Sequence, residues 1–382
     1  MKKISYGGQH IDSSDIEAVK KSLKKKIITS GSSVSNFEKK INSFLKCKFS
    51  TVCNSGTSAI FLALKSLNLK KDDKILMPAV NFISAFNVTK ILGAQPILID
   101  VDETTGQVTP EAIDKYCRKN KLKKFKALIV MYNGGYPLNA QNFFNIKKKY
   151  KCFVIEDACH ALGASYQYKK NILKIGSCKH SDICTFSLHP LKTITTGEGG
   201  IVTTNDKIIN KNIKFLRSHG IVRNKKKHWE YNVAYNSLNF RLTDFQCELG
   251  ISQLKKIRKF VNRRRKISFI YEKKLRLIKN YIKFKFRYKL YNSSYHLLLI
   301  KLKKPNVNLK SKLIKFMLKK NVMLQYHYIP IYKFKIFNKS EKLKGAENYY
   351  QSVVSLPIFY ELSERQIDYI VNQLHSFFKL NA

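Results

Sequence analysis

The sequence is poor in acidic residues and lacks the segments that would anchor a chain in a membrane. Its 382 residues include 25 Asp and Glu against 72 Lys and Arg, which gives a formal net charge of +47. No apolar run reaches the roughly 20 residues that a membrane-spanning helix needs. The start of the chain, MKKISYGGQH, is basic but lacks the apolar core of a signal peptide. We therefore expect a cytoplasmic protein with no membrane partner.

The eight cysteines include no CxxC pair. The spacing of a zinc site is therefore missing, and we expect no metal. Several cysteines lie in apolar runs such as ICTF, where a free Cys behaves as a small hydrophobic residue. We expect reduced thiols, as is usual in the cytosol.

The high positive charge has two interpretations. Clustered Lys and Arg would neutralise phosphates in a nucleic-acid-binding protein. Here the basic residues are spread along the chain in short groups such as KKK and KLKK, and no zinc-finger, helix-turn-helix or RNA-binding aromatic motif is present. Lys, Asn and Ile are also over-represented together, as an A/T-rich genome would encode. We favour compositional bias without a nucleic-acid partner, and a positive field that attracts an anionic substrate.

The first two thirds of the chain alternate between short apolar segments and helical patterns. SSDIEAVKKSL predicts a first helix over 13–26, with Ser13 or Ser14 as its cap. Apolar segments such as QPILIDVD, ALIVMYNGG and FVIEDAC then end in polar residues, and helical segments lie between them. This alternation predicts an α/β fold with a mostly parallel mixed sheet flanked by helices. In such sheets ligands bind at the carboxyl ends of the strands.

The pattern changes near Gln253. A long basic helical stretch, LKKIRKFVNRRRKISFIYEKKLRLI, is followed by the strand-like segment NSSYHLLLIKL and a helix around 309–320. We therefore predict a large domain with an N-terminal arm over 1–255 and a smaller C-terminal α/β domain over 256–382.

The segment NSGTSAI predicts the end of a strand, a tight turn and the start of a helix. Backbone N–H groups at a helix start, together with the helix dipole, attract anions. Gly56 permits the turn, and the hydroxyls of Thr57 and Ser58 can add hydrogen bonds. An ordinary capped helix has the same pattern, so this motif alone assigns no ligand.

In FVIEDACHALGA, two carboxylates follow an apolar strand. Glu156 or Asp157 can cap a helix, or it can hold a protonated heterocyclic nitrogen. His160 lies on the same side if a helical turn begins here. A lone histidine of this kind is more often a hydrogen-bonded structural residue than a catalytic one.

The segment FSLHPLKTITTGEGG places a lysine on a constrained loop. Ser187 ends a strand, Pro190 stiffens the exit, Lys192 follows, and glycines lead into the next strand. Partial burial at such a place would lower the pKa of Lys192 and make its amine nucleophilic. The expected use is a Schiff base with a carbonyl.

These three motifs supply the groups that pyridoxal 5'-phosphate (PLP) requires: a phosphate cradle, a carboxylate for the ring nitrogen and a lysine for the aldehyde. Their order resembles the DegT/StrS group of PLP-dependent sugar-nucleotide aminotransferases, which have the fold type I, aspartate aminotransferase-like architecture. The resemblance runs nearly end to end, through ITSGSSVSNFE, GAQPILIDVD, NFRLTDFQCELGISQL and SLPIFYELSE. It implies a PLP-dependent aminotransferase.

The resemblance implies a cofactor role for each matched residue. Lys192 matches the lysine that forms the Schiff base, and Asp157 matches the partner of the pyridinium nitrogen. Asn239, in LNFRLTD, matches an asparagine that reaches the phosphate of the neighbouring subunit, which implies a homodimer with shared active sites. The remaining matches contact the phosphate (Gly56, Thr57 and Ser187), stack on the ring (Phe82) or lie near the ring hydroxyl (His160).

The resemblance also implies the substrates. L-Glutamate would give its amino group and leave as the oxo-acid, and a keto sugar on a nucleotide would then receive the amino group. The substrate-side contacts implied are Tyr6, Arg217, His219 and His327.

Within this family, SYGGQHIDSSDI, RSHGI and YHYIPIY look most like the pseudaminic-acid branch. That branch aminates C4 of a UDP-4-keto-6-deoxy-N-acetyl hexosamine, which gives UDP-4-amino-4,6-dideoxy-N-acetyl-β-L-altrosamine for surface polysaccharides. Tyr332 departs from the branch, which has a histidine there. An aminotransferase for another nucleotide-linked 3- or 4-keto sugar is the alternative.

Two further classes compete with this interpretation. A sugar dehydratase of the same fold would carry a histidine at the position of Lys192. A non-catalytic basic nucleic-acid-binding or regulatory protein would not need the intact set of cofactor residues.

Overall fold

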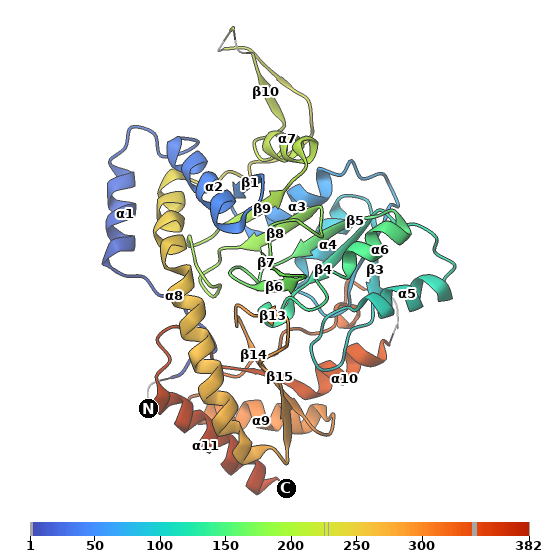
Figure 1. The fold of residues 1–382 in the computed structure, drawn as a ribbon, viewed down its shortest axis with the longest axis vertical. Helices are drawn as coiled ribbons and strands as arrows, with labels where there is room; N and C mark the ends of the chain where they lie inside the picture. Colours follow the sequence, from blue (N-terminus) through green and yellow to red (C-terminus); the bar gives the residue numbers. More distant parts are fainter. Residues whose placement is uncertain (1–2, 225, 228, 338–341, 382) are drawn as a thin grey trace.

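The computed structural model describes residues 3–224, 226–227, 229–337 and 342–381 (Figure 1). Its centre is a seven-stranded sheet in the order β1-β9-β8-β5-β4-β2-β3. The strands are β1 (Phe49–Cys53), β2 (Lys74–Pro78), β3 (Gln95–Ile99), β4 (Ala127–Met131), β5 (Phe153–Asp157), β8 (Ile183–Ser187) and β9 (Gly200–Thr204). Strand β9 is antiparallel to both of its neighbours, and the other pairs are parallel. The predicted mostly parallel mixed sheet is confirmed.

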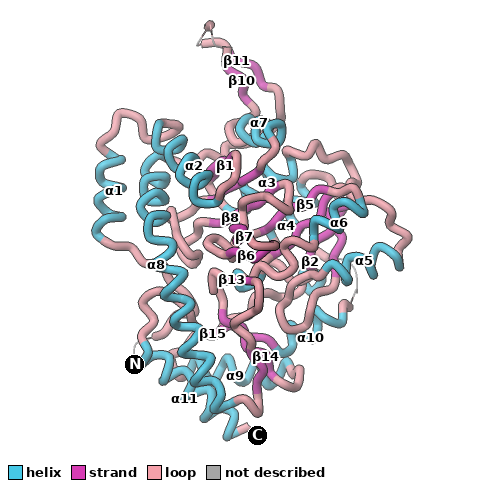
Figure 2. Tube along the Cα trace, viewed as in Figure 1, coloured by secondary structure: helices cyan, strands magenta, loops and turns pink. Residues whose placement is uncertain are grey.

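Helices cover both faces of this sheet (Figure 2). In β4, Leu128 and Val130 belong to one apolar core while Ala127 and Ile129 belong to the other, because successive side chains of a strand point to opposite faces. Helices on the first side are α2 (Ser32–Leu45), α5 (Pro110–Lys119) and α6 (Phe143–Tyr150), and on the second side α3 (Gly56–Lys65), α4 (Ser84–Ile91) and α7 (Lys207–Leu216).

The first helix, α1 (Ser13–Leu23), packs against α8 (Asp244–Lys274). Its cap differs from the prediction. The side chain of Asp12, and not that of Ser13 or Ser14, accepts hydrogen bonds from the first backbone N–H groups. A carboxylate also interacts favourably with the positive end of the helix dipole.

The 31-residue helix α8 leads out of the large sheet into a second layer. This layer has a three-stranded antiparallel sheet of β12 (Ile282–Phe284), β14 (Leu298–Leu302) and β15 (Val353–Leu356). Helices α9 (Val307–Lys319), α10 (Lys344–Ser352) and α11 (Glu364–Leu380) accompany it. The boundary predicted between 255 and 256 falls inside α8, and the division into two domains stays a prediction.

Smaller elements complete the described chain. A hairpin of β10 (Ile221–Arg223) and β11 (Tyr231–Val233) projects from the body at the top of Figure 1. Strands β6 (Ser165–Tyr168), β7 (Asn171–Lys174) and β13 (Tyr291–Asn292) form a separate small sheet. Short 3-10 helices span Asn133–Gly135, Leu275–Ile278 and Ile331–Lys333. Within the described ranges, no helix is both long and apolar enough to cross a membrane.

Candidate active site

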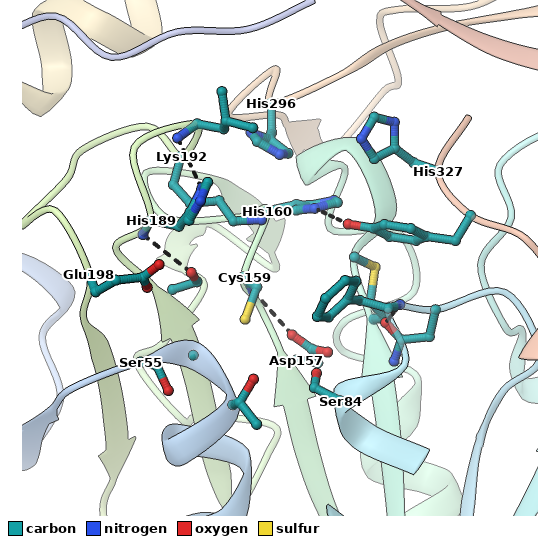
Figure 3. A pocket seen from close by; sticks show the side chains of 18 of the residues that line it. Ser55, Ser84, Asp157, Cys159, His160, His189, Lys192, Glu198, His296 and His327 are labelled. Atoms are coloured by element: carbon teal, nitrogen blue, oxygen red, sulfur yellow. Dashed lines mark hydrogen bonds between the residues drawn. The ribbon is translucent and has the colours of Figure 1, made fainter. Parts of the chain in front are cut away.

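A cavity of about 360 Å³ opens at the carboxyl ends of β5 and β8 (Figure 3). It collects most of the residues that the sequence singled out. These are Tyr6, Gly56, Thr57, Phe82, Asp157, His160, Ser187, Lys192 and His327. In Figure 3, His160, His296 and His327 lie along one side of the cavity, and Ser55, Ser84 and Asp157 lie on the other. The three local motifs therefore meet at one place.

The two adjacent carboxylates at the end of β5 point in different directions, and only one of them faces the cavity. Asp157 is buried and lines the cavity, where one oxygen accepts a hydrogen bond from the N–H of Cys159 at 3.3 Å. Glu156 accepts a hydrogen bond from the Tyr132 hydroxyl at 2.8 Å and does not line the cavity. Burial raises the pKa of Asp157, and the charge of Lys192 opposes that rise.

The loop that carries Lys192 is tied down by its own backbone. The N–H of Leu188 donates to the Gly199 carbonyl at 2.8 Å, and the N–H of Lys192 donates to the His189 carbonyl at 2.9 Å. The Thr195 hydroxyl donates to the Leu188 carbonyl at 2.9 Å. Burial lowers the pKa of Lys192, while the negative charge of Asp157 acts in the opposite direction. The predicted constrained lysine with a depressed pKa is present.

Helix α3 begins at the floor of the cavity. Ser55 caps the helix by accepting a hydrogen bond from the N–H of Ser58 at 3.0 Å. Gly56 and Thr57 form the first turn and line the cavity beside Ser187. Backbone N–H groups, the helix dipole and a hydroxyl therefore converge there, which suits a phosphate.

Phe82 has 53% of its surface exposed although it lines the cavity, and its ring lies 5.9 Å from that of Tyr328. An exposed aromatic face in a cavity is a surface that a flat ring can cover. Next to it, Asn81 is buried, and its side chain faces the carboxyl group of Asp157. The exposed ring of Phe82 fits the binding of a flat ligand.

His327 presents a hydrogen-bond acceptor to the cavity. Its Nδ1 lies 2.9 Å from Ser355 Oγ, and that hydroxyl donates to the Gln325 carbonyl at 2.8 Å. Because the Ser355 hydroxyl already donates its proton to the Gln325 carbonyl, it can only accept from His327. Nδ1 of His327 therefore carries a proton and donates it to Ser355. Burial, assisted by the charge of Lys192, lowers the pKa of His327 to about 3. The neutral ring therefore keeps a lone pair on Nε2.

Three predicted residues lie outside this cavity. Arg217 donates to Glu38 at 2.6 Å and to the Val52 carbonyl at 3.3 Å. His219 lines a shallow depression at the base of the β10–β11 hairpin. Asn239 is exposed, and its side-chain oxygen accepts from the N–H of Arg241 at 3.1 Å. Their roles toward cofactor and substrate stay predictions.

The cavity also contains residues that the sequence reasoning missed. The most prominent are Tyr328 and His296. Tyr328 lies within the segment YHYIPIY, next to the predicted site residue His327. Its position beside a predicted residue could have identified it. His296 begins an ordinary apolar strand segment, and no local pattern marks it.

Tyr332, which stands where the pseudaminic-acid branch has a histidine, donates to Glu347 at 2.8 Å and does not line the cavity. In the described ranges, no group of three His, Cys, Asp or Glu side chains is arranged to hold a metal.

Comparisons with known proteins cover almost the whole chain. The model of the DegT/DnrJ/EryC1/StrS aminotransferase family matches residues 9–375. The UDP-4-amino-4,6-dideoxy-N-acetyl-β-L-altrosamine transaminase of Campylobacter jejuni strain 81-176 is 35% identical over 98% of this chain and 97% of its own length. The transaminase of the same name from Helicobacter pylori is 29% identical over 99% and 98%.

A solved structure is also similar. It is a Helicobacter pylori aminotransferase involved in pseudaminic acid biosynthesis, with a TM-score of 0.90 and 28% identity over 99% of this chain and 100% of that one.

Proposed function

The chain belongs to the DegT/DnrJ/EryC1/StrS aminotransferase family, and we propose that it moves an amino group from L-glutamate to C4 of a UDP-4-keto-6-deoxy-N-acetyl hexosamine. The product is UDP-4-amino-4,6-dideoxy-N-acetyl-β-L-altrosamine, a precursor of pseudaminic acid. The names of the similar Campylobacter and Helicobacter enzymes support this substrate. The observation that carries the proposal is the convergence of Lys192, Asp157 and the start of α3 on one cavity.

The cofactor of this family is PLP. When bound, it carries the amino group between the substrates and accepts the electrons released at the reacting carbon. The residues of the cavity fit it. The start of α3 and Ser187 suit its phosphate, Phe82 suits the face of its ring, and Asp157 suits its ring nitrogen.

Lys192 is the nucleophile and the proton carrier of the proposed reaction. Its lowered pKa keeps part of the amine neutral, and only the neutral amine attacks an aldehyde. Once free, its Nζ takes the proton from the α-carbon of the amino donor. In the return half, Nζ delivers a proton to C4 of the sugar. A base that works near neutral pH needs such a depressed pKa.

Asp157 holds a proton on the ring nitrogen. Burial alone raises the pKa of this carboxyl group, but a cationic nitrogen beside it favours the charged carboxylate. The ion pair thus forms in a buried place, where electrostatic stabilisation is strong.

A homodimer with shared active sites is part of the proposal. Asn239 is exposed outside the cavity of its own chain, so its predicted phosphate contact requires a second copy. The nearby hairpin exposes 67% of Trp229 and 63% of Tyr231, and Leu238, next to Asn239 in the chain, is 61% exposed. Exposed apolar side chains that are grouped in this way are typical of an interface.

We also place the enzyme in the cytoplasm, because all eight cysteines are free and free thiols persist in reducing compartments.

The substrate assignment is tested with purified protein, PLP, L-glutamate and a panel of nucleotide-linked keto sugars. The proposal expects the UDP-4-keto-6-deoxy-N-acetyl hexosamine to give an amino sugar of L-altro configuration, identified by mass and NMR spectroscopy. Faster turnover of a GDP- or dTDP-linked keto sugar would reject this substrate and leave the aminotransferase chemistry in place.

A further inference from the structure

Tyr328 is a cavity residue that none of the roles above uses. It lies between Gln325, which pairs with Ser355 of β15, and the short helix Ile331–Lys333. From there its ring reaches the cavity wall, 5.9 Å from the ring of Phe82 and 5.9 Å from that of His160. Its hydroxyl lies 2.9 Å from His160 Nε2, as a dashed line in Figure 3 marks.

The direction of this hydrogen bond follows from the other nitrogen of His160. The N–H of Gly134 points at His160 Nδ1 at 3.4 Å, and a backbone N–H can only donate. His160 Nδ1 is therefore an acceptor. Burial, with the nearby charge of Lys192, keeps the pKa of His160 well below its ordinary value, so the ring carries one proton. That proton is on Nε2, and it is donated to the Tyr328 oxygen.

The Tyr328 hydroxyl therefore does not donate its own proton to His160. Burial, with the charge of Asp157, raises the pKa of Tyr328 well above its ordinary value, so the phenol keeps its proton. The titratable side chains around it are Tyr6, Asp157, Cys159, His160, His327 and Tyr349. Among the described residues, His160 is the only one of these that forms a hydrogen bond with the Tyr328 hydroxyl, and there the hydroxyl accepts.

We propose that the Tyr328 hydroxyl is a hydrogen-bond donor to the oxygen on the ring of the bound cofactor, held in that direction by His160. This inference rests on the proposed function. The resemblance places His160 itself near the ring hydroxyl, but its single N–H is committed to Tyr328. The tyrosine therefore presents the donor, and the histidine positions it. Phe82, the predicted stacking residue, lies next to Tyr328, so a ring stacked on Phe82 would lie on the same side of the cavity.

The test is a pH titration of the yellow chromophore that the protein forms with PLP alone, in wild type and in Tyr328→Phe. The ring oxygen is negatively charged and stabilises the protonated nitrogen that joins Lys192 to the cofactor. A donor on that oxygen withdraws charge and lowers the pKa of the nitrogen. Loss of a hydrogen bond to a charged group should raise the chromophore pKa by about 1–2 units.

Two companion variants make the result specific. Tyr326→Phe is the matched control, because Tyr326 does not line the cavity, and its chromophore pKa should equal that of wild type. His160→Leu keeps the tyrosine but removes the donor that orients it, and it should raise the chromophore pKa by less than Tyr328→Phe does. If Tyr328→Phe does not fold, a rise in His160→Leu well below about 1 unit supports the inference, and a rise of about 1–2 units overturns it.

The outcomes separate this inference from the proposed function. A wild type that forms no chromophore overturns the proposed function. A wild-type chromophore that titrates identically in Tyr328→Phe overturns the role of Tyr328. A large rise in His160→Leu with none in Tyr328→Phe shows that the histidine contacts the ring oxygen directly, and it also overturns the inference.

Discussion

Gly56 and Ser187 are in contact at the floor of the cavity. A Cβ atom built on Gly56 would lie 2.8 Å from Ser187 Cβ and 3.2 Å from its hydroxyl oxygen. Gly56 is the first residue of α3, and Ser187 is the last residue of β8. The start of the helix can approach the strand end this closely only because the helix begins with glycine. The phosphate cradle is predicted at this contact.

Replacement of Gly56 by alanine should therefore weaken cofactor binding. Overpacking costs about 1–3 kcal/mol, which corresponds to about 5- to 150-fold in the dissociation constant if it falls on the cradle. Titration of the apoprotein with PLP, followed by absorbance, measures this constant. Gly8→Ala is the matched control, because a Cβ there meets no atom within 4 Å. An unchanged constant in Gly56→Ala would mean that the phosphate binds elsewhere.

Asp157→Asn should bind the cofactor but slow its reaction. The cradle and Lys192 remain, whereas the negative charge beside the ring nitrogen is lost. We expect the glutamate half-reaction to slow on the order of 10²–10³-fold, measured as single-turnover loss of the yellow colour. Glu156→Gln removes the neighbouring carboxylate, which faces Tyr132 and not the cavity, and it should react far faster than Asp157→Asn. Equal rates in the two variants would reject the role of Asp157.

The pKa of Lys192 predicts how the apoprotein takes up its cofactor as the pH changes. Burial lowers this pKa from the ordinary value of 10.5, and only the neutral amine reacts. The rate of chromophore formation should rise with pH and level off, with its midpoint below 10.5. The charge of Asp157 raises the pKa of Lys192, so in Asp157→Asn the midpoint should move lower still. A midpoint that moves upward in the variant would contradict this coupling.

Shared active sites predict complementation between two inactive proteins. Lys192→Ala lacks the nucleophile, and Asn239→Ala lacks the residue offered to the neighbouring site. When the two are unfolded together and refolded, a mixed dimer combines Lys192 of one chain with Asn239 of the other in one intact site. Activity should then appear in the mixture. Absence of activity, despite mixed dimers shown by native mass spectrometry, would place Asn239 outside its neighbour's site.

The core of the site was predictable because each of its motifs is local. A strand that ends in a carboxylate or a serine, and a turn that ends in a helix, can be identified within a few residues. Parallel pairing of β5 with β8, which sets Asp157 opposite Thr185, then brings the strand ends together. Ligands bind at the carboxyl ends of the strands in such sheets, and this rule was sufficient to predict that Gly56, Asp157 and Lys192 lie at one site.

The remainder depends on contacts between distant segments. Tyr328 and His296 reach the cavity from the C-terminal part of the chain. The pairings near them, of Gln325 with Ser355 and of β14 with β15, leave no local pattern in the sequence. The residues alone left the choice between Glu156 and Asp157 open. The family resemblance implied Asp157, and the side-chain directions in β5 place that residue in the cavity. At α1, the helix begins at the first serine of its segment, so the residue before it, Asp12, became the cap.

The proposed transamination is tested by the visible absorbance of the protein with PLP, before and after addition of L-glutamate, in wild type and in Lys192→Ala. We expect wild type to turn yellow and then to bleach as the amino group moves to the cofactor, and the variant to form no lysine-linked chromophore. A colourless wild type, or a variant with the same spectrum and the same bleaching, would contradict the assignment of Lys192 and with it the proposed reaction.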